Sequence, residues 1–457
     1  MKEYDLTIIG SGPGGYVAAI KAAQAGKKVA IVEKEAVGGV CLNWGCIPTK
    51  SLLSSTKVYK NFQNAKEFGI DVDKDAFSVN FKKMMAKKDK AVKKLTGGVR
   101  HLLKNNGADL YEGEGTVKDK TTVEVNGETL KSKTLIIATG ASPAVPPIDG
   151  IQKGLDSGKV VTAKGILDIK EQPSSLTIIG GGVIGVEFAT IFATLGTDVT
   201  IVELQEDILP TVDGEIREQF KKALKKAKIK LETSAGVKSI DGGSLTYEKN
   251  GESLTRNSDL ILLSAGMKAN TTSFEALDLE MEKGFVKTDE YARTSVEGVY
   301  AIGDVNGKYM LAHVASKEGV TAVENIDGHA LPVDYGKVPS GIYTFPEIAQ
   351  VGHTEESAKE AGIEYTVSTF PIAANGKAVG EGTNLGMAKM LASKDYHEII
   401  GVHILAPGAT ELISEAVLGM NLEATAADFA HTIHPHPTLS EMLHETAHGI
   451  LDKPIHI

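Results

Sequence analysis

The stretch LTIIGSGPGG, residues 6–15, decides the fold of this chain. Four apolar residues predict a short strand, and the glycine turn after it leads into a helix over residues 16–25. A second apolar strand, residues 29–32, ends at Glu33. Strand, glycine turn, helix and acidic strand end occur here in the order of a dinucleotide-binding βαβ unit.

Each residue type in this unit has a physical task. Gly10 allows the tight turn, Gly12 lets the backbone approach a pyrophosphate, and Gly15 packs the helix against the strand. We expect the helix N-terminus to hold the phosphates and Glu33 to accept the ribose hydroxyls.

The same unit occurs a second time. The stretch LTIIGGGVIG, residues 176–185, is followed by a helix to about residue 195, by an apolar strand over residues 199–202, and by Glu203. The distance from first glycine to acid is 23 positions in both copies, 10 to 33 and 180 to 203. Two units in register predict two dinucleotide sites. The glycines of the second copy are Gly180, Gly182 and Gly185.

Both copies of the unit also end with similar apolar stretches that lead to a glycine. Residues 135–140, LIIATG, end the first copy, and residues 260–266, LILLSAG, end the second. The first copy resumes at residues 299–304, where the strand VYAI is followed by a glycine and Asp304. That carboxylate is a candidate to bind a ribityl or ribose hydroxyl.

Composition sets the limits on function. A chain of 457 residues is too long for one ordinary core and predicts about three domains. The net charge of −10 argues against nucleic acid as a partner. No apolar run approaches the roughly 20 residues that span a bilayer. The first residues lead straight into a strand, so we expect neither signal nor transit peptide and a cytoplasmic protein, of bacterial type.

Two segments are rich in lysine, residues 82–104 and residues 217–230. Both carry apolar residues at helical spacing. We interpret them as helices with one solvated face, and docking of a partner stays as the alternative.

The only two cysteines lie close together in GGVCLNWGCIPTK, residues 38–50. Pro48 suits the first turn of a helix, which places Cys46 at a helix N-terminus, where the helix dipole favours a thiolate. Cys41 is one loop away and free to exchange with a substrate. A buried structural pair stays open as an alternative. Half a metal site is disfavoured because the chain has no second cysteine pair.

This cysteine segment resembles the redox-disulfide motif of the class I pyridine nucleotide-disulfide oxidoreductases. The resemblance covers the whole chain, including the stretches at residues 138–140, 303–304 and 310–313. It implies an α/β fold with two Rossmann-like domains and a C-terminal α+β dimerisation domain. The implied boundaries are 1–145 for the FAD domain, 146–267 for the NAD domain, 268–337 for a central part that returns to the FAD domain, and 338–457 for the interface domain.

The resemblance also implies roles for individual residues. A redox disulfide joins Cys41 to Cys46, with Cys46 facing the flavin and Cys41 open to attack by a dithiol. Lys50 lies near the flavin and pairs with Glu187 at the start of the second glycine-motif helix. On its own, Glu187 is explained as an acid favoured by the helix dipole.

The remaining cofactor contacts implied by the resemblance fall into two groups. For FAD they are Gly14, Gly115, Thr139, Gly140, Ala141, Asp304, Met310, Leu311, Ala312 and His313. For NAD they are Val237 and Gly266.

The C-terminal stretch HPHPTLSE, residues 434–441, holds two histidines between prolines. The resemblance makes His436 the acid-base group, oriented by Glu441. An imidazole with a carboxylate partner suits removal of thiol protons near neutral pH. A surface turn with incidental histidines is the plain alternative.

A rival motif, HETAH at residues 444–448, matches the zinc-protease signature H-E-x-x-H. Only nine residues follow it, and His456 is the single further candidate ligand. We therefore expect no metal site and treat the match as chance.

The residues after Glu203, positions 204–207, are uncharged or acidic, so a 2′-phosphate would meet repulsion and NAD is favoured over NADP. This argues against glutathione reductases. Mercuric reductases carry a C-terminal cysteine pair, and NADH oxidases of the wider family use one cysteine. The resemblance is therefore closest to the members that oxidise protein-bound dihydrolipoamide with NAD⁺ through FAD.

Those members work as homodimers with a lipoyl-bearing protein of a 2-oxo acid dehydrogenase or glycine cleavage complex. The chain departs from many relatives at residues 267–270, MKAN, where an arginine-rich stretch is common, which leaves the contacts of this loop open. A non-enzymatic nucleotide-binding or docking protein is the alternative from another class, and the complete cysteine and histidine set argues against it.

Overall fold

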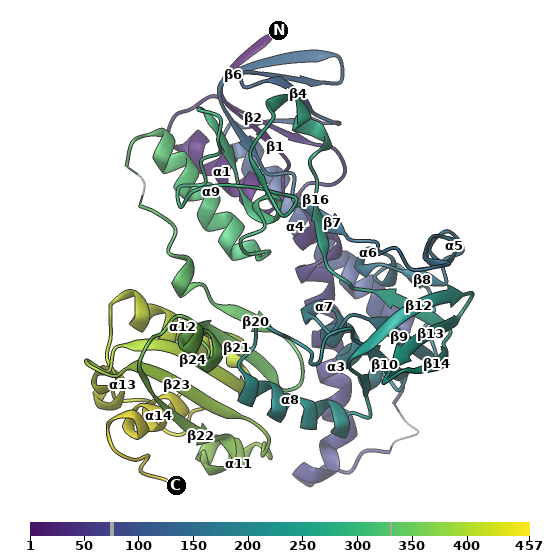
Figure 1. Ribbon diagram of the computed structural model, residues 1–457, viewed down its shortest axis with the longest axis vertical. Coiled ribbons are helices and arrows are strands. Elements are labelled where there is room, and N and C mark those ends of the chain that lie inside the picture. Colours follow the sequence, from purple (N-terminus) through teal and green to yellow (C-terminus); the bar gives the residue numbers. More distant parts are fainter. Residues whose placement is uncertain (74–76, 330) are drawn as a thin grey trace.

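The computed structural model describes residues 1–73, 77–329 and 331–457 and has three bodies (Figure 1). In that view the N-terminal body lies at the top, the second lies at the right, and the C-terminal body lies at the lower left. This confirms the α/β fold class with two Rossmann-like parts and a further C-terminal part. The exact domain boundaries stay predictions.

The first body is a mostly parallel sheet with strand order β3-β2-β1-β6-β5-β4. β1 pairs with both β2 and β6 in parallel, as the first βαβ unit requires. β19 pairs with β6, so the strand over residues 299–301 returns to the first sheet as the sequence predicts. The strands are β1 (Lys2–Ile9), β2 (Val29–Glu33), β3 (Asp109–Glu112), β4 (Thr116–Asp119), β5 (Thr122–Val125), β6 (Glu128–Ile137) and β19 (Val299–Ala301).

Helices cover this sheet because their apolar faces have no other place to be buried. α1 packs against both the sheet and α9. α1 begins three residues earlier than predicted, since Pro13 occupies its first turn, where a fixed φ and a missing N–H cost nothing. The helices are α1 (Pro13–Gln24), α2 (Gly39–Trp44), α3 (Cys46–Asn64), η1 (Ala65–Phe68), α4 (Phe81–Asn105), η2 (Thr272–Leu277), η3 (Gly303–Asn306) and α9 (Ala312–Ile326).

The second body repeats the design, with parallel strand order β11-β10-β9-β15-β8 and a three-stranded antiparallel sheet at its side. α7 carries eight buried residues and fills the centre. The elements are α5 (Ile151–Asp156), β8 (Val160–Val161), α6 (Ala163–Ile166), β9 (Ser175–Ile179), α7 (Val183–Thr194), β10 (Asp198–Val202), α8 (Gly214–Lys226), β11 (Lys230–Glu232), β12 (Ala235–Asp241), β13 (Ser244–Lys249), β14 (Glu252–Asn257) and β15 (Leu260–Leu263).

The chain crosses between these two bodies twice, and the two crossings pair with each other. β7 (Ala141–Pro143) leads out of the first body, and β16 (Met267–Ala269) leads back in antiparallel contact with it. β17 (Met281–Glu282) and β18 (Phe285–Val286) form a small hairpin on the way back.

The C-terminal body is one antiparallel sheet, order β20-β21-β24-β23-β22, with helices on one side. β23 and β24 are buried along nearly their whole length. The elements are η4 (Tyr335–Lys337), β20 (Ser340–Ile342), β21 (Glu347–Gly352), α10 (Glu355–Glu360), β22 (Tyr365–Pro371), η5 (Ile372–Ala374), α11 (Gly376–Gly380), β23 (Met387–Ser393), β24 (Ile399–Ala406), α12 (Ala409–Asn421), α13 (Ala426–His431) and α14 (Glu441–Leu451).

The lysine-rich segments are helical with one correction. Residues 82–104 lie in α4, whose buried side holds Met84, Met85, Val99 and Leu103. Residues 217–230 do not form one helix, because α8 ends at residue 226 and Lys230 begins β11. Among the described residues, no helix is both long enough and apolar enough to cross a bilayer.

A buried lysine fixes the C-terminal body against the second one. The Lys389 side chain is 2% exposed, and its Nζ lies 3.0 Å from the Asp213 carboxylate and 2.6 Å from that of Glu355. Asp213 caps the N-terminus of α8 by accepting the Glu215 N–H at 3.1 Å. The fully buried His403 lies near Asp213, and burial lowers its pKa. An ammonium from one body therefore neutralises a carboxylate of the other.

We predict that Lys389→Met destabilises the protein strongly. The substitution fills the same volume but leaves the buried Asp213 carboxylate without its cation, which costs about 3–5 kcal/mol. Chemical denaturation of Lys389→Met and of Lys394→Met, whose pair with Glu364 is mostly exposed, provides the comparison. The exposed pair contributes about 0–1 kcal/mol. Equal losses in the two variants would show that Lys389 does not hold the bodies together.

Candidate active site

The first glycine loop has no room for side chains at two positions. Gly10 has φ +102°, and a Cβ on it would lie 2.2 Å from the Ala138 carbonyl oxygen. A Cβ on Gly15 would lie 2.0 Å from the Gly10 carbonyl oxygen. Both contacts are with backbone, which cannot move aside, so glycine is required for the turn and for the packing of α1.

The second glycine loop repeats this geometry. Gly180 has φ +105°, and a Cβ on it would meet the Ser264 carbonyl oxygen at 2.5 Å. A Cβ on Gly185 would meet the Gly180 carbonyl oxygen at 2.1 Å. The duplication seen in the sequence is therefore also a duplication of backbone conformation.

One glycine of each loop faces open space instead. Gly12 and Gly182 are the N-caps of α1 and α7, and neither helix has a side-chain cap at this end. A Cβ on Gly12 would meet only the Gly39 Cα, at 4.0 Å, and one on Gly182 would meet nothing within 4 Å. Two uncapped helix N-termini with free space before them fit the pyrophosphates of two dinucleotides.

Glu33 and Glu203 are turned toward their own loops. One oxygen of Glu33 accepts the Ser11 N–H at 2.9 Å and the Ser11 hydroxyl at 2.7 Å. One oxygen of Glu203 accepts the Gly181 N–H at 2.6 Å, and the other accepts the Gln205 N–H at 2.8 Å. The carboxylates thus order the glycine loops, and their contact with ribose stays a prediction.

The cysteine segment is built directly onto the first glycine loop. The Gly38 N–H donates to the Ser11 carbonyl at 3.0 Å, and a Cβ on Gly39 would lie 2.7 Å from the Gly12 Cα. Only a glycine with φ +59° at position 39 allows this approach. The segment that carries both cysteines is therefore anchored where the first dinucleotide fits.

The two cysteines lie on two helices in succession. Cys46 is the first residue of α3, as the proline in its first turn predicts. Cys41 lies within the short helix α2, which the sequence did not predict, and Gly45 stands where one loop was expected between the two cysteines. Gly45 separates the helices with φ −133° and ψ −113° and brings the second helix back against the first.

The thiols differ in acidity. Both are free cysteines, and their side chains hydrogen-bond to each other. The hydrogen bond from Cys41 lowers the pKa of Cys46, and the Lys50 ammonium and the backbone N–H at the helix start add to this against burial. The same bond and burial raise the pKa of Cys41. The geometry thus favours a Cys46 thiolate that accepts a hydrogen bond from the Cys41 thiol.

A buried ion pair stands beside the cysteines. The Lys50 Nζ lies 2.9 and 2.8 Å from the two oxygens of Glu187, which is 3% exposed. The Tyr343 N–H also donates to Glu187, at 3.0 Å, and the Tyr343 ring lies 4.6 Å from the Lys50 Nζ. Glu187 sits in the second turn of α7, so the helix dipole does not explain it. The pair joins α3, α7 and the C-terminal body.

Asp304 lies in η3, three residues after the end of β19; it is half-buried and lies near a second carboxylate that sequence reasoning missed. Burial and the nearby Glu318 raise the pKa of Asp304 to about 6. Glu318 on α9 is fully buried and accepts the Gly303 N–H at 2.6 Å and the Tyr335 hydroxyl at 2.7 Å. A glutamate on the apolar face of a helix is the signal that could have found it.

The other predicted cofactor residues lie around these loops. Met310 and Leu311 precede α9, and its first two residues are Ala312 and His313. Gly115 packs against Val32 at the end of β2. Thr139 and Gly140 directly precede β7, Ala141 begins it, Gly266 directly precedes β16, and Val237 lies in β12.

The stretch at residues 267–270, which differs from the arginine-rich stretch of many relatives, connects the two bodies. Asn270 donates its Nδ2 to the Thr139 carbonyl at 2.9 Å, and its own carbonyl accepts the Thr139 hydroxyl at 2.7 Å. This segment therefore closes the paired crossing between the two bodies.

His436 and Glu441 form the predicted dyad. The His436 Nδ1 lies 2.8 Å from the Glu441 Oε1. Because a carboxylate only accepts, Nδ1 carries the proton and Nε2 is left as the acceptor. Burial works against ionisation of Glu441, but hydrogen bonds from the Thr438 N–H and from His436 prevail and lower its pKa. The His436 side chain is 76% exposed and lies on the C-terminal body.

The zinc-protease match is accounted for by other contacts. Glu445 is buried and accepts the Ile455 N–H at 2.7 Å and the His456 Nδ1 at 2.7 Å, which holds the C-terminus against α14. His444 and His448 hydrogen-bond to each other at 3.1 Å. Within the described ranges, no group of three histidine, cysteine or carboxylate side chains could hold a metal ion.

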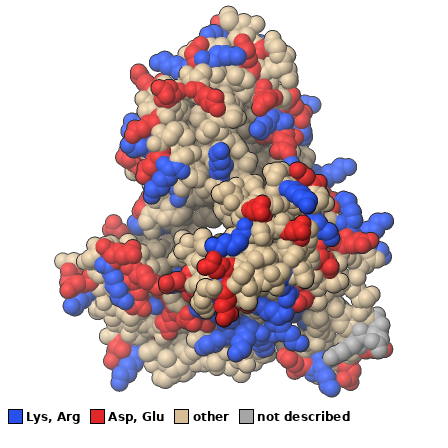
Figure 2. All heavy atoms as spheres, turned by 45° about the vertical axis from the view of Figure 1, so that its right-hand side comes forward, with Lys and Arg blue, Asp and Glu red and all other residues tan. Residues whose placement is uncertain are grey.

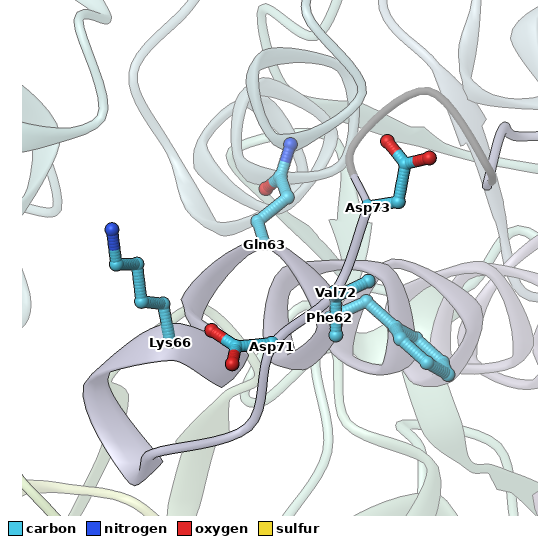
Figure 3. Close-up of a pocket in the computed structure, with 6 residues that line it drawn as sticks. All are labelled: Phe62, Gln63, Lys66, Asp71, Val72 and Asp73. Atoms are coloured by element: carbon cyan, nitrogen blue, oxygen red, sulfur yellow. The ribbon is translucent and has the colours of Figure 1, made fainter.

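Two hollows flank the cysteine helices. One of about 300 Å³ includes Trp44, which ends α2 and whose ring lies 4.1 Å from the Lys164 Nζ. The other, of about 400 Å³, lies at the far end of α3 (Figure 3). It is lined by Phe62, Gln63, Lys66, Asp71, Val72 and Asp73. Neither hollow lies between the glycine loops and the cysteines.

Comparison with known proteins agrees with this geometry. The family described as pyridine nucleotide-disulphide oxidoreductase matches residues 4–319, and the dimerisation domain of that family matches residues 338–447. A dihydrolipoyl dehydrogenase of Acholeplasma laidlawii is 52% identical over 72% of this chain and 98% of its own length. One of Bacillus subtilis is 42% identical over 99% of both chains.

A solved structure has the same fold. The Cu(II) complex of the HOCl-induced flavoprotein disulfide reductase RclA from Escherichia coli superposes with a TM-score of 0.87. It is 26% identical in sequence and covers 98% of this chain and all of its own.

We predict that the charges of Lys50 and Glu187 have opposite effects on the Cys46 thiol. Lys50→Met removes a cation and raises the Cys46 pKa, whereas Glu187→Gln removes an anion and lowers it. The pH dependence of thiolate absorbance in the reduced protein measures both midpoints. Lys57→Met, which removes an exposed cation of the same helix, serves as the matched control and moves the midpoint little. Shifts of the same sign in Lys50→Met and Glu187→Gln would contradict this assignment.

Proposed function

Because this chain belongs to the pyridine nucleotide-disulphide oxidoreductase family, we propose that it is a dihydrolipoyl dehydrogenase. It oxidises protein-bound dihydrolipoamide to lipoamide with NAD⁺ as the acceptor. The observation that carries the proposal is the contact between the cysteine segment and the first glycine loop, which sets a dithiol beside a dinucleotide cradle.

FAD fits the first loop, because the cysteines are anchored there, and NAD fits the second, because Glu203 opposes a 2′-phosphate. The residues that would hold the cofactors are those of the two glycine loops, with Lys50 beside the cysteines. When bound, FAD supplies a two-electron acceptor next to Cys46, and NAD⁺ supplies the final hydride acceptor.

The protein's own residues perform the thiol chemistry. His436 takes a proton at Nε2 from one thiol of the substrate, and the resulting thiolate attacks the Cys41 sulfur of a Cys41–Cys46 disulfide. The bond between the two cysteines breaks, and its electron pair stays on Cys46, whose lowered pKa suits it as the leaving thiolate. The second substrate sulfur then attacks the first, the mixed disulfide bond to Cys41 breaks, and the lipoyl disulfide closes. The proton of this second thiol passes to the departing Cys41 sulfur.

The dimerisation domain supports a homodimer. We place each active site between two chains, because His436 is exposed on the C-terminal body and the cysteines lie on the first body. The partner is a lipoyl-bearing protein of a 2-oxo acid dehydrogenase or glycine cleavage complex. The location we propose is the cytoplasm.

A direct test compares substrates and cofactors. The purified protein with FAD should oxidise dihydrolipoamide, with kcat/KM for NAD⁺ more than about tenfold above that for NADP⁺, a difference of about 1.4 kcal/mol. In the reverse direction NADH should reduce lipoamide and should leave glutathione disulfide and mercuric ion unreduced. Equal rates with both nicotinamides would contradict the role assigned to Glu203. Reduction of glutathione disulfide but not of lipoamide would contradict the proposed activity.

The shared site is tested by mixing two inactive variants, His436→Gln and Cys46→Ser. Random pairing gives about half heterodimers, and each holds one intact site of two, so roughly a quarter of the wild-type activity should return. If each site lay within a single chain, no activity would return, because every chain lacks one essential group. Mass spectrometry of the mixture shows whether heterodimers are present.

A further inference from the structure

Helix α4 is strongly basic in an acidic protein. Its 25 residues contain nine Lys and Arg and one Asp, a net charge of +8, against −10 for the whole chain. The other residues together therefore carry −18. Figure 2 shows one face of the whole protein, on which Lys and Arg gather in a lower region and are mixed with Asp and Glu elsewhere.

Four of these lysines form one stripe, named here the lysine face. They are Lys83, Lys87, Lys90 and Lys94, all exposed, and the spacing of four, three and four residues puts them on one side of the helix. In the part of the chain that the structure describes, α4 makes ion pairs only through Lys88 and Arg100, which are not in the stripe. Four like charges on one helix side repel one another, so the free chain gains no stability from them.

The lysine face adjoins the cysteine helices. α4 packs along α3 and also contacts α2, so it touches the two helices that carry Cys46 and Cys41. The Lys87 Nζ lies 3.3 Å from the Ser51 carbonyl oxygen and 3.3 Å from the Ser55 hydroxyl, both on α3. Ser51 follows Cys46 by five residues, which is about 7.5 Å along a helix axis.

We propose that the lysine face is the surface on which the lipoyl-bearing domain docks through an acidic face of its own. This inference rests on the proposed function, which requires a thiol on a flexible protein side chain to reach Cys41 in repeated short encounters. Complementary charge raises the rate of such encounters without a long-lived complex. A permanent contact with a second copy of this chain would instead bury apolar groups, and lysine is depleted from such interfaces.

The test separates docking from chemistry by using two forms of the same substrate. The triple variant Lys83→Gln, Lys90→Gln, Lys94→Gln removes three charges and keeps Lys87, which contacts α3. Its kcat/KM is measured on free dihydrolipoamide and on a purified, reduced lipoyl domain. We expect no change on the free compound and a loss of about tenfold on the domain, since steering contributes tenfold or more to association. Raised ionic strength should reduce the difference.

Two control variants define the cause. The same lysines changed to Arg keep the charge and should keep the rate on the domain. Lys120→Gln, Lys153→Gln, Lys283→Gln removes three exposed charges elsewhere and should leave both rates unchanged. A loss in this control equal to that of the lysine-face variant would overturn the proposal, because the effect would then come from net charge alone.

The other outcomes are equally decisive. An equal loss on both substrates would assign the lysine face to the active site itself, and conversion of the dimer to monomers would assign it to the second copy. Unchanged rates on the domain, with loss of binding to a DNA duplex or to anionic phospholipid vesicles, would assign it to another class of partner. Each of these results overturns the proposal. If the wild-type protein oxidises neither substrate, the proposed function fails instead.

Discussion

The close approach of two backbones, at Gly12 and Gly39, is the constraint on which the site depends. The cysteine segment can lie against the first glycine loop only because Gly39 has no side chain, since a Cβ there would lie 2.7 Å from the Gly12 Cα. The Gly38 N–H bond to Ser11 and the Glu33 bonds to the same serine hold this contact in place. A nucleotide cradle and a dithiol are thereby parts of one rigid unit, and the spacing between them does not depend on a mobile loop.

Buried charge pairs then place the other two bodies around this unit. Lys50 and Glu187 tie the cysteine helix to the second Rossmann-like body, and Tyr343 from the C-terminal body completes the contact. Lys389 and Asp213 tie the second and third bodies at another point. Breaking such a pair leaves an uncompensated charge in a dry environment, so these contacts define one arrangement more sharply than apolar packing alone.

Local chemistry made much of this predictable from the sequence. The loops are specified by the glycine spacing and the acidic strand ends, and the start of α3 is specified by Pro48. Each of these signals affects only residues close to it in the sequence. The pairing of His436 with Glu441 was instead implied by the family resemblance, and their side chains lie 2.8 Å apart. Its catalytic role, like the other site assignments, stays a prediction.

The features that could not be predicted depend on contacts between residues that are far apart in the sequence. The Gly12–Gly39 contact, the Tyr343 bond to Glu187 and the buried Glu318 each need the folded chain. The helix that contains Cys41 was not predicted, because α2 is only six residues long and has no signal beyond its glycines. The stretch at 217–230 looked uniform in charge, yet a strand begins at its last residue, since pairing with β10 overrides a weak propensity.

The two glycine loops are alike in backbone conformation and differ in what lies beside them. The cysteine segment lies across the first loop, whereas nothing lies within 4 Å of the corresponding position in the second. A shift of the first loop therefore also moves the segment that carries both cysteines, whereas the second loop has no such neighbour at Gly182.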